Sequence, residues 1–167
     1  MENMKVLKAK IEDLPVVLSL FQDAIQYMNN HNIPQWDEYY PNEEVLREDI
    51  QNKELYIVKM EETIVSVFVI NFNYDEEYSK GDWKYKGDSF AVLHRLCVNV
   101  QFQNQGIGKN TLSIIEKMLK ENNIKAVRLD AFSKNPYALR LYENNNYKRV
   151  GEVNFRKGLF YLYEKIL

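Results

Sequence analysis

The chain has almost no cysteine and no long apolar run, and these two absences restrict where it can work. Its 167 residues include one cysteine, Cys97, so no internal disulfide can form and an intracellular protein is indicated. No apolar run reaches the roughly 18 residues of a membrane-spanning helix. The first ten residues carry charges where a signal peptide would have its apolar core. We therefore expect a cytoplasmic protein that does not bind a membrane.

The chain also lacks an excess of charge of one sign. Its 22 basic and 24 acidic residues leave a net charge of -2, and no basic run occurs, so we expect no nucleic-acid partner. Hydrophobic residues make up 46% and charged residues 28%, a balance typical of a soluble globular protein. Since no repeat, low-complexity tract or linker interrupts the chain, we predict a single domain over residues 1–167.

The spacing of apolar residues predicts a mixture of helices and strands around one sheet, an α+β arrangement. Asp13 and Pro15 are suited to the start of the first helix, and Asn42 is suited to cap the second. Residues 73–88 form a charged, aromatic insertion, which we interpret as a loop or an irregular extension of a hairpin. The predicted strands cover residues 4–8, 55–58, 64–70, 90–100, 127–132, 147–154 and 159–165, and the helices cover 14–28, 42–50, 106–122 and 136–144.

The segment from Leu96 to Lys109 has the composition of an anion-binding turn. A strand ends, a polar turn with two glycines follows, and a helix begins. The free amides and positive dipole end of a helix N-terminus attract anions, and glycines let the main chain approach a phosphate closely. Two familiar phosphate motifs are excluded. A Walker A loop would need glycine at Gln103, and a dinucleotide fingerprint would need glycine at Thr111.

The remaining pattern, Gln103-x-x-Gly106-x-Gly108, resembles the acyl-CoA loop of the GNAT superfamily of N-acetyltransferases, which reads Gln/Arg-x-x-Gly-x-Gly/Ala. A second segment resembles the same superfamily. About thirty residues further on, a predicted strand is followed by Asn135, Ala138 and Tyr142, with the family's spacing of three and four residues. The order of predicted helices and strands also matches, so the resemblance extends over nearly the whole chain.

This resemblance implies a three-layer α/β/α fold. Its sheet would be mixed but mostly antiparallel, with about seven strands, a splayed central pair and about four flanking helices. It also implies an enzyme that transfers an acetyl group from acetyl-CoA to a primary amine of a small molecule or peptide by direct attack in a ternary complex. No metal is implied. Family members often pair through their sheets, so a homodimer is a further expectation.

Individual positions receive roles from the resemblance. Tyr142 would act as the general acid that protonates the departing thiolate, although a tyrosine that only packs its helix against the sheet fits the pattern too. Asn135 would hydrogen-bond the pantetheine arm, and it is equally suited to cap the helix that begins at Pro136. The implied acyl-CoA-binding residues are Leu96, Cys97, Val98, Gln103, Asn104, Gln105, Gly106, Ile107, Gly108, Lys109, Asn135 and Tyr142.

The general base is less defined. Asp130 stands where certain N-terminal-peptide acetyltransferases carry a catalytic glutamate, so it is a candidate base or a strand-end carboxylate turned to solvent. His94 titrates in a useful range and is a candidate acceptor contact or a structural histidine. Cys97, between two apolar residues, is better interpreted as a small strand residue than as a nucleophile.

The acceptor pocket is expected from the aromatic stretch between the first two helices, with Trp36, Tyr39 and Tyr40, together with His94. Aromatic rings beside carboxylates suit an ammonium group, and they suit a packed loop equally well. A different class of function also fits: a non-catalytic module of the same fold that senses acyl-CoA or serves as a scaffold. Two departures from the family pattern are Asn146, where relatives carry glycine, and Val100, where they carry proline.

Overall fold

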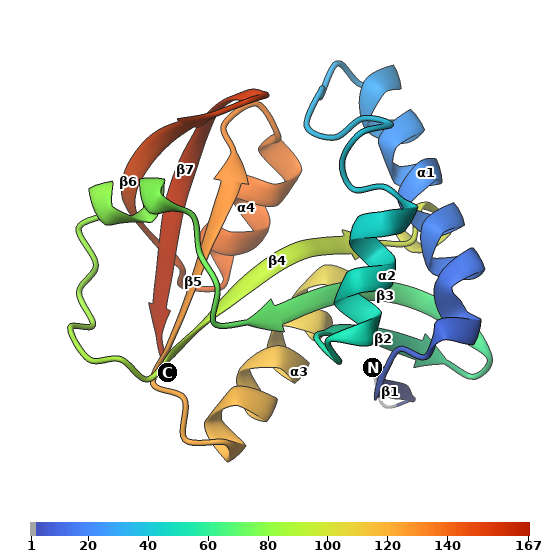
Figure 1. Ribbon diagram of the computed structural model, residues 1–167, viewed down its shortest axis with the longest axis horizontal. Helices are drawn as coiled ribbons and strands as arrows, with labels where there is room; N and C mark the ends of the chain where they lie inside the picture. Colours follow the sequence, from blue (N-terminus) through green and yellow to red (C-terminus); the bar gives the residue numbers. More distant parts are fainter. Residues whose placement is uncertain (1–2) are drawn as a thin grey trace. The chain divides into compact units, whose positions relative to one another are not determined.

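The computed structural model describes residues 3–167, which form seven strands and four α-helices (Figure 1). The strands are β1 (Met4–Lys8), β2 (Leu55–Met60), β3 (Thr63–Asn71), β4 (Phe90–Val98), β5 (Ala126–Phe132), β6 (Lys148–Phe155) and β7 (Gly158–Ile166). The helices are α1 (Leu14–Asn30), α2 (Glu43–Gln51), α3 (Ile107–Glu121) and α4 (Pro136–Asn144).

The strands follow the order β1-β2-β3-β4-β5-β7-β6 in one sheet, in which β4 and β5 are parallel and the other registered pairs are antiparallel. This architecture confirms the predicted α+β fold. The chain divides into two compact units. The first contains the described residues up to Ile70 together with Arg95–Leu112, and the second contains Asn71–His94 and Ser113–Leu167. The single domain predicted over residues 1–167, of which residues 1 and 2 lie outside the described chain, stays a prediction.

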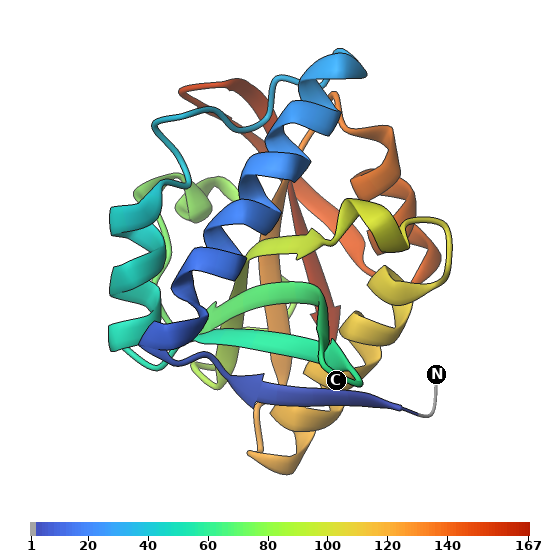
Figure 2. The same cartoon turned by 90° about the vertical axis from the view of Figure 1, so that its right-hand side faces the viewer.

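In the first unit, α1 and α2 share one hydrophobic core with the strands. Figure 2 shows α1, drawn in blue, running obliquely in front of strands of this unit. Alternate strand residues such as Ile57 and Val67 point to this side, as expected from the two-residue period of a strand. The core residues of this cluster include Val17, Phe21, Trp36, Leu46, Ile50, Leu55, Ile57, Val67, Val69 and Cys97.

The first turn of α3 is attached to β3 by two buried hydroxyls. Ser66 Oγ and Thr111 Oγ1 lie 2.7 Å apart, and both residues are fully buried. Thr111 Oγ1 also donates to the Ile107 carbonyl at 2.7 Å. Since a buried hydroxyl without a partner is costly, this pair fixes the position of the helix start on the strand.

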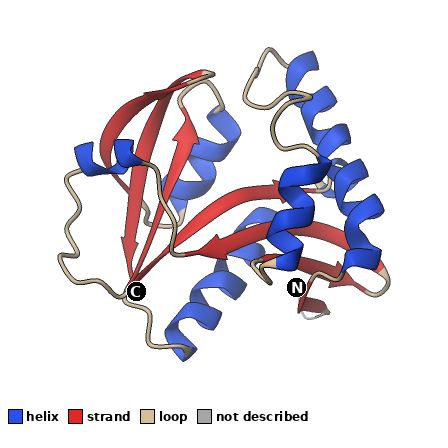
Figure 3. Ribbon diagram, viewed as in Figure 1, coloured by secondary structure: helices blue, strands red, loops and turns tan. Residues whose placement is uncertain are grey.

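The second unit has an insertion between β3 and β4 that is anchored to the sheet. Figure 3 shows it as a long loop with one short helical segment, η2 (Glu76–Lys80). Tyr78 and Trp83 pack against Leu162 of β7 in a hydrophobic cluster. The buried carboxylate of Glu164 accepts the main-chain N–H of Lys84 at 2.7 Å. The predicted irregular loop is therefore held by buried contacts that residues far along the chain supply.

The caps of α2 and α4 agree with the sequence-based expectations, whereas β4 ends before its predicted position. Asn42 Oδ1 accepts from the Val45 amide at 3.0 Å, and Asn135 Oδ1 accepts from the Ala138 amide at 3.1 Å. The strand predicted over residues 90–100 ends at Val98. It ends early because Asn99 donates from Nδ2 to the Ile64 carbonyl at 2.9 Å and accepts the Gln101 amide at 3.0 Å, which starts a short 3₁₀ segment.

In the described part of the chain, every helix is too short or too polar to cross a bilayer.

Thr111→Val tests the buried hydroxyl pair. It should lower the free energy of unfolding by about 1–3 kcal/mol, because Ser66 keeps a buried hydroxyl without its partner. Urea unfolding would measure this loss. In a double-mutant cycle with Ser66→Ala, the two losses should fall short of additive by about 1 kcal/mol. Ser113→Ala, at an exposed position of the same helix, is the control, and a loss equal to that of Thr111→Val would contradict the assignment.

Candidate functional site

The turn between β4 and α3 has an unusual main chain. Asn104 and Gly106 both adopt left-handed conformations, with φ of 62° and 76°. Glycine adopts this conformation without cost, and asparagine tolerates it better than most residues. Asn104, Gln105 and Gly106 are all exposed, so the turn presents main-chain atoms to the solvent.

This turn leads into helix amides that have no helical partner. The helical hydrogen bonds begin with the Asn110 amide, which donates to the Gly106 carbonyl at 3.0 Å. The amides of Ile107, Gly108 and Lys109 precede that bond, as the first amides of any helix do. The Lys109 side chain is exposed in the same turn. Together the amides, the helix dipole and the lysine make the predicted anion site chemically suitable for a phosphate.

The strand that leads to this turn is interrupted at its middle. The parallel ladder between β4 and β5 covers only Phe90–Val92 on the β4 side. Arg95 has a φ of 50°, a left-handed conformation that is uncommon for a non-glycine residue and rarer still in a strand. Main-chain groups near such a break lie outside the regular ladder and can bond other partners. Leu96 and Val98, the proposed pantetheine edge, follow directly and are half-buried.

The Cys97 thiol lies in the hydrophobic core of the first unit and is 6% exposed. Burial raises the pKa of this thiol well above its ordinary value, so the thiolate is disfavoured. The geometry therefore favours the small strand residue over the nucleophile.

In the second unit, Tyr142 lies on α4 among aromatic rings. Its ring centroid lies 5.6 Å from that of Tyr147, in an edge-on contact, and 5.9 Å from that of Tyr163. The hydroxyls of those two neighbours donate to Glu116 and Glu143, whereas the Tyr142 hydroxyl forms no hydrogen bond with any described residue. Burial, helped by the nearby negative charge of Asp130, raises the pKa of Tyr142 above its ordinary value of 10.0. The phenol is thus protonated at neutral pH, as an acid must be.

Comparison with known proteins agrees with these features. The model of the acetyltransferase (GNAT) family matches residues 19–147. The chain belongs to the acetyltransferase (GNAT) family.

Solved structures of this family share the fold. A GNAT-family acetyltransferase from Streptococcus agalactiae is similar to this chain with a TM-score of 0.87 and 19% identity, over 99% of this chain and 96% of that one. A PaiA N-acetyltransferase from Thermoplasma acidophilum, solved in complex with coenzyme A, has a TM-score of 0.74 and 19% identity, over 98% of this chain and 99% of that one. The ribosomal-protein-S18-alanine N-acetyltransferase of Escherichia coli has a TM-score of 0.70 and 13% identity, over 98% of this chain and 93% of that one.

For a GNAT member, the candidate base Asp130 has an unexpected neighbour. Asp130 Oδ2 accepts a hydrogen bond from the Tyr78 hydroxyl at 2.7 Å, and Tyr78 belongs to the insertion. Burial and the Asp130 charge raise the pKa of Tyr78 well above its ordinary value. Its hydroxyl therefore keeps its proton and remains a hydrogen-bond donor. The base role of Asp130 stays a prediction.

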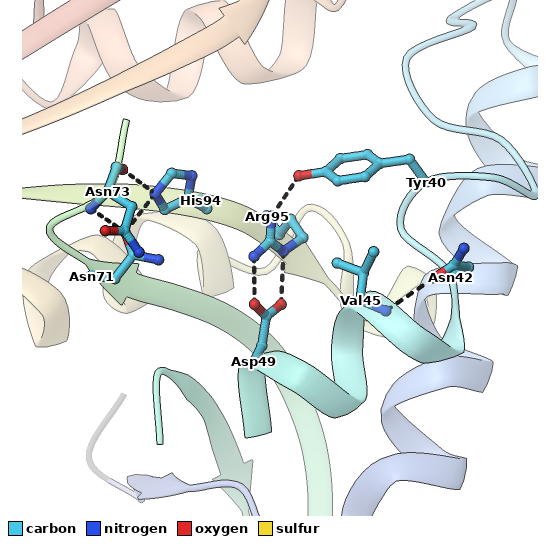
Figure 4. Close-up of polar contacts among 8 residues, drawn as sticks. All are labelled: Tyr40, Asn42, Val45, Asp49, Asn71, Asn73, His94 and Arg95. Atoms are coloured by element: carbon cyan, nitrogen blue, oxygen red, sulfur yellow. Dashed lines mark hydrogen bonds and ion pairs between the residues drawn. The ribbon is translucent and has the colours of Figure 1, made fainter. Parts of the chain in front are cut away.

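His94, the candidate acceptor contact, has a defined tautomer. Its Nε2 lies 2.8 Å from Asn71 Oδ1 and 3.1 Å from the Asn73 carbonyl (Figure 4). The Asn73 amide donates to the same Asn71 Oδ1 at 2.9 Å, which fixes that atom as an oxygen. Because both neighbours are acceptors, Nε2 carries the proton, and in the neutral ring the lone pair is at Nδ1. These contacts fit a structural histidine, and contact with an acceptor stays a prediction.

The three aromatic residues of the predicted acceptor pocket differ in exposure. Trp36 is buried against Phe21, with ring centroids 5.4 Å apart, and belongs to the core of the first unit. Tyr39 is exposed, while Tyr40 is 38% exposed and accepts a hydrogen bond from Arg95 Nη1. Their predicted contact with the acceptor is a proposal. Within residues 3–167, no group of three or more His, Cys, Asp or Glu side chains is placed to hold a metal ion.

Sequence reasoning missed Arg95, Asp49 and Tyr78. Nothing in the residues around Arg95 indicates a left-handed backbone, and its contact with Asp49 joins positions 46 residues apart. Tyr78 lies in an insertion with no periodic pattern. Asn146, which stands where relatives carry glycine, has a φ of 69°, the left-handed conformation that asparagine tolerates.

The raised pKa of Tyr142 predicts a loss of stability at alkaline pH. Above pH 10 the unfolded phenol ionises while the folded phenol keeps its proton, so the native state binds more protons. The free energy of unfolding should therefore fall, by about 1.4 kcal/mol per pH unit for each such phenol. Urea unfolding between pH 9 and 11 should show a shallower fall for Tyr142→Phe than for wild type. Tyr137→Phe, which removes an exposed phenol of the same helix, should follow wild type, and an unchanged slope in Tyr142→Phe would refute the assignment.

Proposed function

We propose that this protein is an N-acetyltransferase that moves an acetyl group from acetyl-CoA to a primary amine of a small molecule or peptide by direct attack in a ternary complex. Because the chain belongs to this family, the proposal depends on one observation. The turn at Asn104 and Gly106 is exposed and left-handed, and it leads directly to the first amides of α3. Such a turn offers N–H donors and a positive dipole end to a diphosphate.

The residues present fit coenzyme A. A side chain at Gly106 would meet strain at its φ of 76°, which explains the glycine in a turn whose main chain approaches a ligand. The side chains of Gln103 and Lys109 add a polar group and a cation beside the amides from Asn104 to Gly108. The main chain of Leu96, Cys97 and Val98 is proposed to bond the pantetheine arm as an added strand would, and Asn135 to bond the same arm.

Each proposed catalytic group has one task. Acetyl-CoA supplies the activated acyl thioester. The amide near Val98 polarises its carbonyl, as a donor aimed at a developing oxyanion does. Tyr142 donates its phenolic proton to the departing sulfur, and Asp130 accepts a proton from the attacking amine. The phenol of Tyr142 keeps its proton throughout the neutral range and so has one to donate, although its raised pKa makes it a weaker acid than a free phenol.

The acceptor is an amine bound near the segment that contains Trp36, Tyr39 and Tyr40, with His94 as a further contact. One protein of the same fold, the E. coli N-acetyltransferase, is named for an alanine of ribosomal protein S18 as its acceptor. A cytoplasmic location and a homodimer belong to the same proposal.

A thiol-release assay with acetyl-CoA against polyamines, amino acids, aminoglycosides and short peptides tests the function directly. Release of free thiol that depends on one amine class supports the enzyme. Binding of coenzyme A by calorimetry, without release for any amine, would instead establish the non-catalytic acyl-CoA module. Absence of binding to coenzyme A would refute both.

Tyr142→Phe should lose most turnover while coenzyme A binding is retained. The ring still packs in α4, and only the proton donor is lost, so kcat should fall about 10²- to 10⁴-fold. Initial rates with saturating acetyl-CoA, together with calorimetry, measure the two effects. Tyr137→Phe, on the exposed side of the same helix, is the control. A kcat in Tyr142→Phe equal to wild type would remove Tyr142 from the acid role.

Lys109→Gln should weaken coenzyme A binding about five- to tenfold, because one charge-assisted contact to a phosphate is lost. The effect should shrink at high salt and be absent for pantetheine, which has no diphosphate. Lys117→Gln removes an exposed lysine from the same helix and should leave the affinity within about twofold of wild type. Equal losses in the two variants would point to net charge and not to a diphosphate site.

A further inference from the structure

Arg95 combines a left-handed backbone with a side chain that is only 11% exposed. A non-glycine residue in this conformation costs about 1–2 kcal/mol, so its surroundings must hold it there. The contacts of the Arg95 side chain therefore bear on the role of this residue.

Two residues of the same unit bind the guanidinium from separate segments, as Figure 4 shows. Asp49 of α2 accepts from Nε at 2.9 Å and from Nη2 at 2.7 Å. The Tyr40 hydroxyl accepts from Nη1, and the guanidinium carbon lies 5.6 Å from the centroid of the Tyr40 ring. The planar guanidinium, with several N–H donors in fixed directions, can bond both partners at once, whereas the ammonium group of a lysine could not.

The Asp49 carboxylate changes what the arginine can bind. It is 9% exposed and holds the guanidinium in a two-point ion pair, which offsets the positive charge. An anionic acceptor would therefore find little net attraction at Arg95. The remaining function of the cluster is mechanical: it connects a strand, a helix and the segment between α1 and α2.

That segment is fixed at several points, and the Tyr40 hydroxyl connects it to Arg95 of β4. Asp37 Oδ1 accepts the amides of Tyr39 and Tyr40 at 3.0 and 3.2 Å, which shapes the turn. Asn42 caps α2 directly afterwards. These bonds are local, whereas the Arg95–Tyr40 bond joins positions 55 residues apart. Without it, the segment would lose a direct connection to the strand.

We propose that Arg95 is a positioning residue for the acceptor amine: paired with Asp49, it holds Tyr40 and thereby the segment between α1 and α2 against the left-handed break in β4. This inference rests on the proposed function, because that segment is the proposed acceptor site. Acceptor affinity then depends on the Tyr40 hydroxyl, while the turn that binds coenzyme A does not.

Tyr40→Phe is the decisive variant, because it deletes one hydroxyl and leaves the ring and the Arg95–Asp49 pair. Hydrogen exchange of residues 33–41 should become about tenfold faster. The KM for the amine that wild type acetylates fastest in the thiol-release screen should rise about fivefold or more, with kcat and the Kd of acetyl-CoA within about twofold of wild type. Tyr56→Phe removes a phenol of the same unit whose ring stacks on Phe68 of the sheet, and it should change none of these quantities.

Two variants of Arg95 separate the effect of its left-handed backbone from the effect of its contact with Tyr40. Arg95→Gly accepts the left-handed φ without strain but has no guanidinium, and Arg95→Lys keeps a charge for Asp49 but loses the fork. Both should raise the amine KM at least as much as Tyr40→Phe does. Adding Tyr40→Phe to Arg95→Lys should then raise it little further, since both changes break the same bond. If Arg95→Gly fails to fold, because Asp49 loses its partner, the Tyr40→Phe and Arg95→Lys results still decide.

The outcomes distinguish the two proposals. Unchanged exchange and unchanged amine KM in Tyr40→Phe would overturn the positioning role, even in an active enzyme. Faster exchange in Tyr40→Phe, with no turnover by wild type for any amine, would support the contact between segment and strand and overturn the acetyltransferase proposal. A raised Kd for acetyl-CoA in Tyr40→Phe would overturn the assignment to the acceptor side.

Discussion

A left-handed backbone is costly for most residues, and this chain adopts it at two places in the segment proposed to bind the cosubstrate. One is the left-handed Arg95 in β4, and the other is the turn through Asn104 and Gly106 that begins α3. Both would be costly in an unsupported chain. Side chains hold them: Arg95 through Asp49, and the start of α3 through the Thr111–Ser66 pair. The proposed cosubstrate, with its diphosphate and amide carbonyls, is rich in the acceptors that such a main chain lacks.

The insertion before β4 shows how a local addition can reach chemically important groups. Buried polar residues far along the chain hold it: Glu164 accepts its main-chain amides, and Arg128 donates to the Tyr85 carbonyl at 2.8 Å. Once held, the insertion brings Tyr78 to Asp130. The insertion therefore contacts the group that sequence alone would nominate as a base.

Features that depend on neighbours in sequence were predictable. Asn42 and Asn135 cap their helices, and Asn146 is left-handed, because a cap or a turn involves only the next few residues. The start of α3 follows for the same reason from a strand, a polar turn and two glycines. Features that depend on distant partners were not predictable. The end of β4 was predicted at Val100 and lies at Val98. It ends early because the Asn99 side chain donates a hydrogen bond to the Ile64 carbonyl, 35 residues away.

The sequence by itself determined the family, the order of helices and strands, and the turn suited to a diphosphate, since each is encoded in short-range spacing of apolar, polar and glycine residues. Only the tertiary structure decided that Trp36 is a core residue, that Cys97 is too buried to act as a thiolate, and that Arg95 joins Asp49 and Tyr40. The physical reason is that burial and ion pairing depend on which segments pack together. Arg95 lies 46 residues from Asp49 and 55 residues from Tyr40 in the sequence, and no local pattern indicates that the folded sheet and helices bring them into contact.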